Sequence, residues 1–197
     1  MLPAAIGHYA FGVAPSDKLA AVLLERIRHL TRAERIVLTR ASVIGRRFRL
    51  AVLASTTTLG PDRVRAILDK ACALQFIVRE SSRCDWYAFR HALIRDVAYE
   101  ELVATFVRPL HRLIARGIER CSSGDDSLED LAYHSWAARD ALRCLRYNEL
   151  AGDQAAAVFA ADDAQMYYSR AREFARCRSK HYRRLTSKLR ALQCDKR

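Results

Sequence analysis

The hydrophobic period of the chain changes at residues 76–89, and this change restricts the fold more than any other feature of the sequence. Before it, apolar residues recur every three to four positions, as they do along one face of an α-helix. Two short runs rich in β-branched and aromatic residues follow, Phe76-Ile-Val78 and Trp86-Tyr-Ala-Phe89, on either side of a polar segment. Such runs predict a small β-hairpin within an otherwise helical chain.

Two helices are expected at the N-terminal end. Residues 16–30 carry apolar side chains on one helical face. Thr31 and Glu34 then form a capping-box pattern, in which each side chain bonds a free backbone amide at the start of a helix. We expect this second helix to run to about Ile44 and to end at Gly45.

A short helix is expected over residues 48–54, and Gly60-Pro61 predicts the start of another that reaches about residue 74. Proline is well tolerated at an early helical position because the amide hydrogen that it lacks would have no partner there. Helices followed by a hairpin predict a winged helix-turn-helix, with the hairpin as a minor β-wing.

The composition favours helix along most of the chain. Of 197 residues, 51% are hydrophobic and only 7 are Gly and 4 Pro, so the chain can bury a core. It has no apolar run of about eighteen residues and no signal-peptide pattern, and we expect a cytoplasmic protein. The six cysteines lie far apart, without a C-x-x-C pair or clustered histidines. We therefore expect reduced, structural cysteines and no metal site.

The second half of the chain is expected to be a series of helices. Residues 91–103 and 109–121 follow the helical period, and the turn-forming, acidic segment 122–126 is the predicted linker. Further helices are expected over 128–138, 140–159 and 162–177. Before the linker, three residues at helical spacing are expected in the core: Tyr99, Leu102 and Phe106.

A repeat pattern is visible beyond the linker. Small and aromatic residues recur there at tetratricopeptide spacing, where small side chains let two helices approach closely and an aromatic ring fills the gap. These residues are Gly152, Ala164, Tyr168 and Ala171. An ordinary helical hairpin is the alternative interpretation.

The predicted fold is therefore mainly α, a winged helix-turn-helix followed by a tetratricopeptide-like helical array. Its expected divisions are an N-terminal extension (1–15), a winged-helix domain with its following helices (16–121), the linker (122–126), and a helical segment with a basic tail (127–197).

Two segments resemble a signature of bacterial STAND-type signalling ATPases: Phe89-Arg-His-Ala-Leu-Ile-Arg-Asp-Val-Ala-Tyr-Glu100 and Leu110-His-Arg-Leu-Ile114. Large LuxR-type regulators and the ATPase modules attached to some adenylate cyclases belong to this class. Residues 38–48 are similar to the helix that enters their winged-helix domain. Leu131-Ala-Tyr-His134 and residues 141–175 are similar to the start of their tetratricopeptide array. The resemblance implies an order of ATPase, winged helix, repeat array and sometimes an effector domain.

The ATPase of that order has no counterpart in this sequence. No G-x-x-x-x-G-K-[ST] motif occurs, so the backbone cradle and lysine of an ordinary triphosphate site are missing. No Ser/His/Asp or Cys/His arrangement suggests catalysis. We expect a non-catalytic regulatory module with no cofactor of its own. ATP or ADP would act only through a P-loop ATPase domain, in the same chain or another, and further repeats or a protein would be partners.

His91 is the first candidate site residue. Phe89-Arg-His91 is similar to the Met-His-Asp motif of related plant and animal STAND receptors, whose histidine contacts the phosphate of bound ADP. The resemblance implies nucleotide sensing by His91, with Ala92 in place of the motif's Asp; a histidine bonded to local backbone is the alternative. Arg95, one turn further, is a candidate second phosphate or interface contact, or forms local ion pairs.

DNA binding by the winged helix is the alternative function. The net charge is +12, and a basic surface attracts nucleic acid and acidic proteins alike. The expected recognition helix, 61–74, carries Asp62 and Asp69, which offset its basic side chains. The candidate nucleic-acid-binding residues are Arg63, Arg65 and Lys70 on that helix, and Arg183, Arg184 and Lys188 in the basic tail.

Overall fold

The computed structural model describes residues 17–80, 85–100, 104–121 and 127–194. Within these ranges the chain is mainly helical, with ten helices and a small antiparallel sheet of three strands. The elements, in chain order, are α1 (Asp17–Arg28), α2 (Arg32–Ile44), β1 (Arg47–Arg49), α3 (Leu50–Ser55), α4 (Pro61–Ala73), β2 (Ile77–Arg79), β3 (Trp86–Phe89), α5 (Ala92–Glu100), α6 (Ala104–Cys121), α7 (Leu128–Ala137), α8 (Ala141–Ala157), α9 (Ala161–Phe174) and α10 (Lys180–Cys194).

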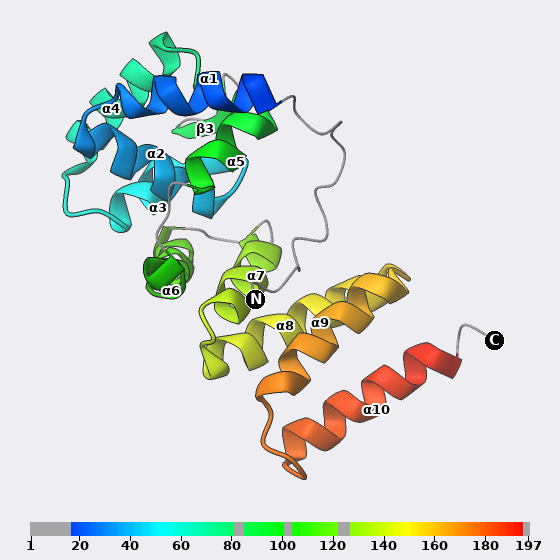
Figure 1. Ribbon diagram of the computed structural model, residues 1–197. Helices are drawn as coiled ribbons and strands as arrows, with labels where there is room; N and C mark the ends of the chain where they lie inside the picture. The colour runs from blue at the N-terminus through cyan, green and yellow to red at the C-terminus, as the bar shows by residue number, and fades with distance from the viewer. Residues whose placement is uncertain (1–16, 81–84, 101–103, 122–126, 195–197) are drawn as a thin grey trace.

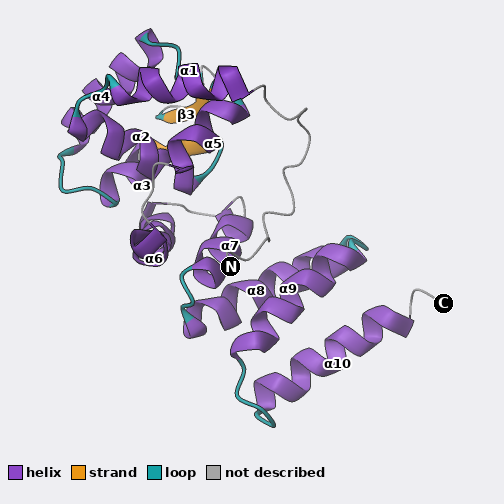
Figure 2. Cartoon of the chain, in the orientation of Figure 1, coloured by secondary structure: helices purple, strands orange, loops and turns teal. Residues whose placement is uncertain are grey.

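The sheet lies among helices α1 to α5, and α6 and α7 lie between this part and the last three helices (Figure 1). Figure 2 shows the strands enclosed by the surrounding helices. No helix in the described ranges is both long and apolar enough to cross a membrane.

Helix α2 begins and ends as the sequence predicts. The Thr31 hydroxyl accepts a hydrogen bond from the Glu34 amide, and the Glu34 carboxylate accepts one from the Thr31 amide, at 2.9 Å. The helix ends at Gly45, whose φ of 151° is accessible to glycine and strained for other residues. These local interactions satisfy backbone groups that the helix itself leaves free.

The sheet contains the predicted hairpin and one strand that was not predicted. Strands β2 and β3 pair antiparallel, and β1 pairs with the other edge of β3, in the order β1-β3-β2. The expected helix over 48–54 was therefore wrong at its start, because Phe48 lies in β1 and α3 begins at Leu50. Phe48 is opposite Tyr87, with ring centroids 6.1 Å apart, and this cross-strand contact determines its conformation.

Helix α6 also departs from the prediction. It begins at Ala104 rather than at Pro109, and Pro109 lies inside it. A proline removes one backbone hydrogen bond, but the buried side chains of Leu110, Ile114 and Ile118 keep the helix on the core. Phe106 was expected in the core and is 65% exposed, because it lies at the start of α6, one turn before Leu110, the first buried residue of the helix. Leu102 falls outside the described residues, while Tyr99 is partly buried as expected.

The last helices occupy the predicted segments, and the small residues make the predicted close contact. The Tyr168 ring of α9 packs on Gly152 of α8, and Ala164 and Ala171 are buried beside it. The Tyr168 hydroxyl donates to Asp153 at 2.7 Å. Leu185 and Leu189 of α10 complete this small core.

Replacing Gly152 with alanine is expected to lower the free energy of unfolding by roughly 1–3 kcal/mol. A Cβ atom at this position would lie 2.5 Å from the Tyr168 ring, so the ring must move. Without this contact, alanine would stabilise the helix relative to glycine. A loss of stability therefore indicates that the Tyr168 ring packs on residue 152. Chemical denaturation measures it.

The control is the same substitution in a Tyr168→Leu background. There the clash is relieved, and Gly152→Ala should cost much less or become stabilising. Equal costs in both backgrounds would contradict the contact.

Candidate functional site

His91 lies at an exposed corner formed by the ends of the sheet. It follows β3 directly, and its neighbour Arg90 donates its amide to the Phe76 carbonyl at the start of β2. On the other edge, the Phe89 amide donates to the Arg46 carbonyl, just before β1. Arg46, Arg90 and His91 are all exposed. The backbone pairing thus brings two arginines to the ends of the sheet at which His91 lies, and sequence reasoning missed both.

Helix α5 starts immediately after this corner, at Ala92. The first amides of a helix have no partner within it and favour anions. Guanidinium groups bind phosphate through paired hydrogen bonds, and an imidazole can donate one more. The exposed corner therefore combines side-chain donors that suit an anion with the first amides of a helix.

Arg95 does not belong to the exposed corner. Its Nε atom donates to the Ser42 carbonyl at 3.1 Å, and the side chain is partly buried. This bond ties α5 to α2. Neither Arg95 nor Asp96 forms an ion pair with a described residue, so the local ion bridge expected as the alternative is not present. Arg95 is a structural residue in this geometry.

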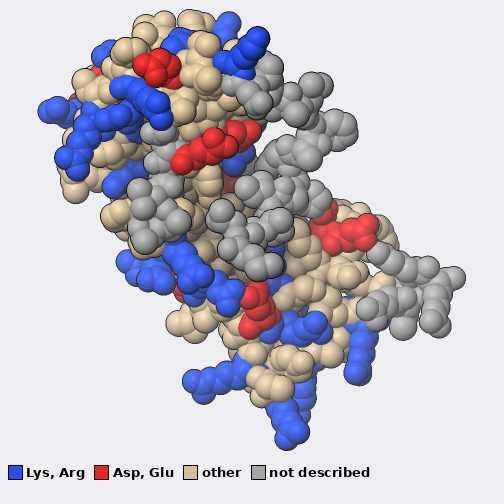
Figure 3. Space-filling view, viewed as in Figure 1, with Lys and Arg blue, Asp and Glu red and all other residues tan. Residues whose placement is uncertain are grey.

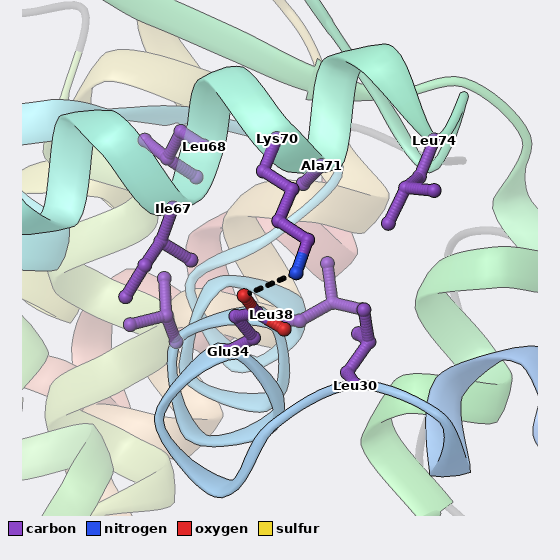
Figure 4. A pocket seen from close by; sticks show the side chains of 9 residues that line it. Leu30, Glu34, Leu38, Ile67, Leu68, Lys70, Ala71 and Leu74 are labelled. Carbon is purple, nitrogen blue, oxygen red and sulfur yellow. Dashed lines mark hydrogen bonds and ion pairs between the residues drawn. The ribbon is translucent and has the colours of Figure 1, made fainter.

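Two of the three candidate cations on α4 are neutralised within the chain. Arg65 donates to Asp85 at 2.8 Å, and this hydrogen bond lowers the pKa of the Asp85 carboxyl. Lys70 reaches across a shallow apolar groove between α4 and α2 to Glu34, at 2.7 Å (Figure 4). The hydrogen bond from Lys70, followed by that from the Thr31 amide, lowers the pKa of Glu34.

The exposed face of α4 is consequently close to neutral. Arg63 is exposed and forms no ion pair with a described residue, but Asp62 and Asp69 are exposed on the same helix. A helix that tracks a phosphate backbone needs an excess of positive charge on its outer face. The structure does not bring Arg63, Arg65 and Lys70 together into such a face.

The basic tail is also partly neutralised. Arg184 bonds Glu149, and Lys188 bonds Glu149 at 2.9 Å and Asp153, so α10 faces the acidic side of α8. Arg183 alone of the three tail candidates is exposed without such a partner among the described residues. Two of the three tail residues named as candidate nucleic-acid contacts, Arg184 and Lys188, therefore have acidic partners within the chain.

A buried histidine pair joins the sheet-bearing part to the later helices. His111 of α6 and His134 of α7 are 2% and 0% exposed, with their Nδ1 atoms 2.7 Å apart. His134 Nε2 lies 3.2 Å from the Ile44 carbonyl at the end of α2. A carbonyl only accepts, so His134 donates through Nε2 and accepts at Nδ1 from His111. Burial disfavours the charged form of both rings, so this arrangement is that of a neutral pair.

Burial lowers the pKa of His111 to about 4. Burial, and then the neighbouring His111, lower that of His134 to about 3. Sequence reasoning assigned neither residue a role, although each falls within a segment that carries the family resemblance. The contact between the two rings joins these segments, one on α6 and the other on α7, in the structure.

Among the described residues, Cys72, Cys121, Cys144 and Cys177 are free, and no group of three His, Cys, Asp or Glu side chains could hold a metal ion. Comparison of the chain with protein-family models and with curated proteins finds no match.

Proposed function

We propose that this chain is a non-catalytic regulatory module of a STAND-type signalling ATPase, in which a winged helix contacts a nucleotide-binding domain and a tetratricopeptide-like array relays the change of state. The order α2, β1, α3, α4, β2, β3 supports the winged helix, because helices then alternate with three strands that pair as β1-β3-β2. The Gly152–Tyr168 contact between α8 and α9 supports the repeat array.

The observation that carries the proposal is the exposed corner of Arg46, Arg90 and His91. In the proposed role, the ATPase domain binds ADP and presents its phosphates to this corner. The contact would favour the closed arrangement of the two domains, since a ligand shifts an equilibrium by its differential affinity for the two states.

The buried histidine pair supports the relay. It connects the end of α2 to α6 and α7, and the larger hydrophobic core contains residues from both sides of the segment 122–126. A displacement of the sheet-bearing part therefore acts on α7 and α8 through packed side chains rather than through a loose tether.

The test joins this chain, as one polypeptide, to a P-loop ATPase domain of the STAND class. His91→Ala is expected to weaken ADP binding roughly ten- to a hundredfold, which corresponds to the 1.5–3 kcal/mol of a hydrogen bond to a charged group. Calorimetry measures the affinity. Thermal melting of each variant checks that the fold is intact.

Two control variants make this test specific. His29→Ala removes an exposed histidine at the end of α1, and Arg95→Ala removes the structural tie to Ser42. The first should leave ADP affinity unchanged, and the second should lower the melting temperature more than the affinity. Unchanged affinity in a folded His91 variant would reject the sensor role and leave the chain as a scaffold.

A further inference from the structure

Helix α6 carries four arginines at intervals of four residues: Arg108, Arg112, Arg116 and Arg120. All four are exposed. Each step advances about 6 Å along the helix axis and turns about 40° around it. The arginines therefore form a continuous stripe about 18 Å long on the outer face. Figure 3 shows Lys and Arg side chains gathered where α6 is seen end-on in Figure 1.

No carboxylate among the described residues forms an ion pair with this stripe. The one acidic residue of α6, Glu119, is already occupied by Arg143, at 3.0 and 3.1 Å, and by the Tyr147 hydroxyl at 2.7 Å. Asp140, the N-cap residue of α8, bonds Arg143 and lies close enough to Arg112 for their charges to interact, although the two form no ion pair. In this respect the stripe differs from Arg65 and Lys70 of α4 and from Arg184 and Lys188 of α10, which have acidic partners.

The stripe is also held rigidly. The opposite face of α6 packs on the core through Leu110, Ile114 and Ile118, and Gly117 lies against Ser55 of α3. Four arginines are thus carried by a helix that is already fixed in place, without the entropic cost of ordering a flexible segment on binding.

We propose that this arginine stripe binds the phosphate backbone of nucleic acid without sequence preference. A chain with a net charge of +12 attracts polyanions, and arginine matches phosphate geometry through paired hydrogen bonds. The surface lies outside α4, so the inference is independent of the proposed regulatory function and of the recognition-helix alternative.

An anionic membrane fits this face less well. Membrane-surface helices insert a wide apolar face, whereas the exposed large apolar side chains of α6 are Phe106 and Leu113, and its apolar face is buried in the protein. An acidic protein could match the charge, but protein interfaces place aromatic and other large apolar side chains at their centre, and among the described residues of α6 only Leu113, 40% exposed, lies beside the stripe. Both are outcomes of the test.

The test measures binding of the full chain to labelled DNA of about twenty nucleotides, single-stranded and duplex, as a function of salt concentration. Four phosphate contacts contribute about −3.6 to the slope of log K against log salt for a duplex, and about −2.8 for a single strand. The variant R108Q/R112Q/R116Q/R120Q should lose this part of the slope. For the duplex, a slope of this size means that raising the salt concentration from roughly 50 to 200 mM weakens binding by about a hundredfold.

The matched control removes four other exposed cations, at the turn between α9 and α10: R176Q/R178Q/K180Q/R183Q. It should leave most of the slope intact, and unchanged melting temperatures would show that both variants are folded. A single R116E substitution should also weaken binding, since it reverses the charge at the centre of the face.

Three results would overturn the proposal. The first is DNA binding that the stripe variant retains in full. The second is a slope lost in the control variant instead. The third is binding to polyglutamate or to phosphatidylserine vesicles that is as tight as binding to DNA and equally dependent on the stripe.

Discussion

Acidification from pH 7 to pH 5 is expected to lower the free energy of unfolding by about 4 kcal/mol through His111 and His134 alone. Their folded pKa values, about 4 and about 3, lie below the ordinary 6.5 of a histidine. Between these values the unfolded chain binds more protons than the folded one, so the stability is fully present above pH 6.5 and falls as the pH falls. Each pH unit below 6.5 lowers the free energy of unfolding by about 1.36 kcal/mol per histidine, so the loss at pH 5 is roughly 2 kcal/mol for each ring.

Urea denaturation at several pH values between 7.5 and 5 measures this dependence. His111→Asn keeps a hydrogen-bond donor beside His134 but removes one titrating ring, so the loss between the two pH values should fall by about half. His29→Gln removes a histidine that is 78% exposed beyond the end of α1, and the loss should persist in this variant because the buried pair is intact. A wild-type stability that does not change over this range would contradict a buried neutral pair.

The elements that could be predicted from the sequence are those that local chemistry determines. The capping box of Thr31 and Glu34 and the Gly60-Pro61 helix start each depend on residues within one turn. The hairpin could be predicted because its two strands lie close together in the chain. The Gly152–Tyr168 contact could be predicted because a small residue on one helix and an aromatic residue on the next have the spacing of closely packed helices.

The missed features depend on residues far apart in the sequence. Strand β1 exists because Phe48 finds Tyr87 on a partner strand, and the residues around Phe48 fit a helical period as well. Lys70 is neutralised by a residue 36 positions away, and Arg184 by one 35 positions away. A count of charge along the sequence cannot reveal such pairs.

The same limit explains why the candidate sites shifted. The corner at His91 gains Arg46 only through backbone pairing in the sheet. The arginines of α6 have a visible four-residue spacing, but with Phe106 expected in the core and the helix expected to start at Pro109, the orientation of this face could not be derived.

Replacing Phe48 with alanine is expected to lower the free energy of unfolding by about 3–5 kcal/mol. The side chain is 1% exposed and packs between the sheet and the helices, with ring centroids 6.1 Å from Tyr87 and 5.8 Å from Phe89. Alanine leaves a cavity that the stacked rings on β3 cannot fill without disturbing the strand pairing. Chemical denaturation in urea at neutral pH measures the change.

The matched control lies directly across the strand pair. Tyr87→Phe keeps the ring that stacks on Phe48 and removes only a buried hydroxyl for which no described residue supplies a hydrogen-bond partner. This change should be neutral or stabilising, because an unsatisfied polar group is costly to bury. Both results are expected only if β1 pairs with β3 as described. A cost below about 1 kcal/mol for Phe48→Ala would place this ring at the surface, and the sheet that positions Arg46 beside His91 would then have only two strands.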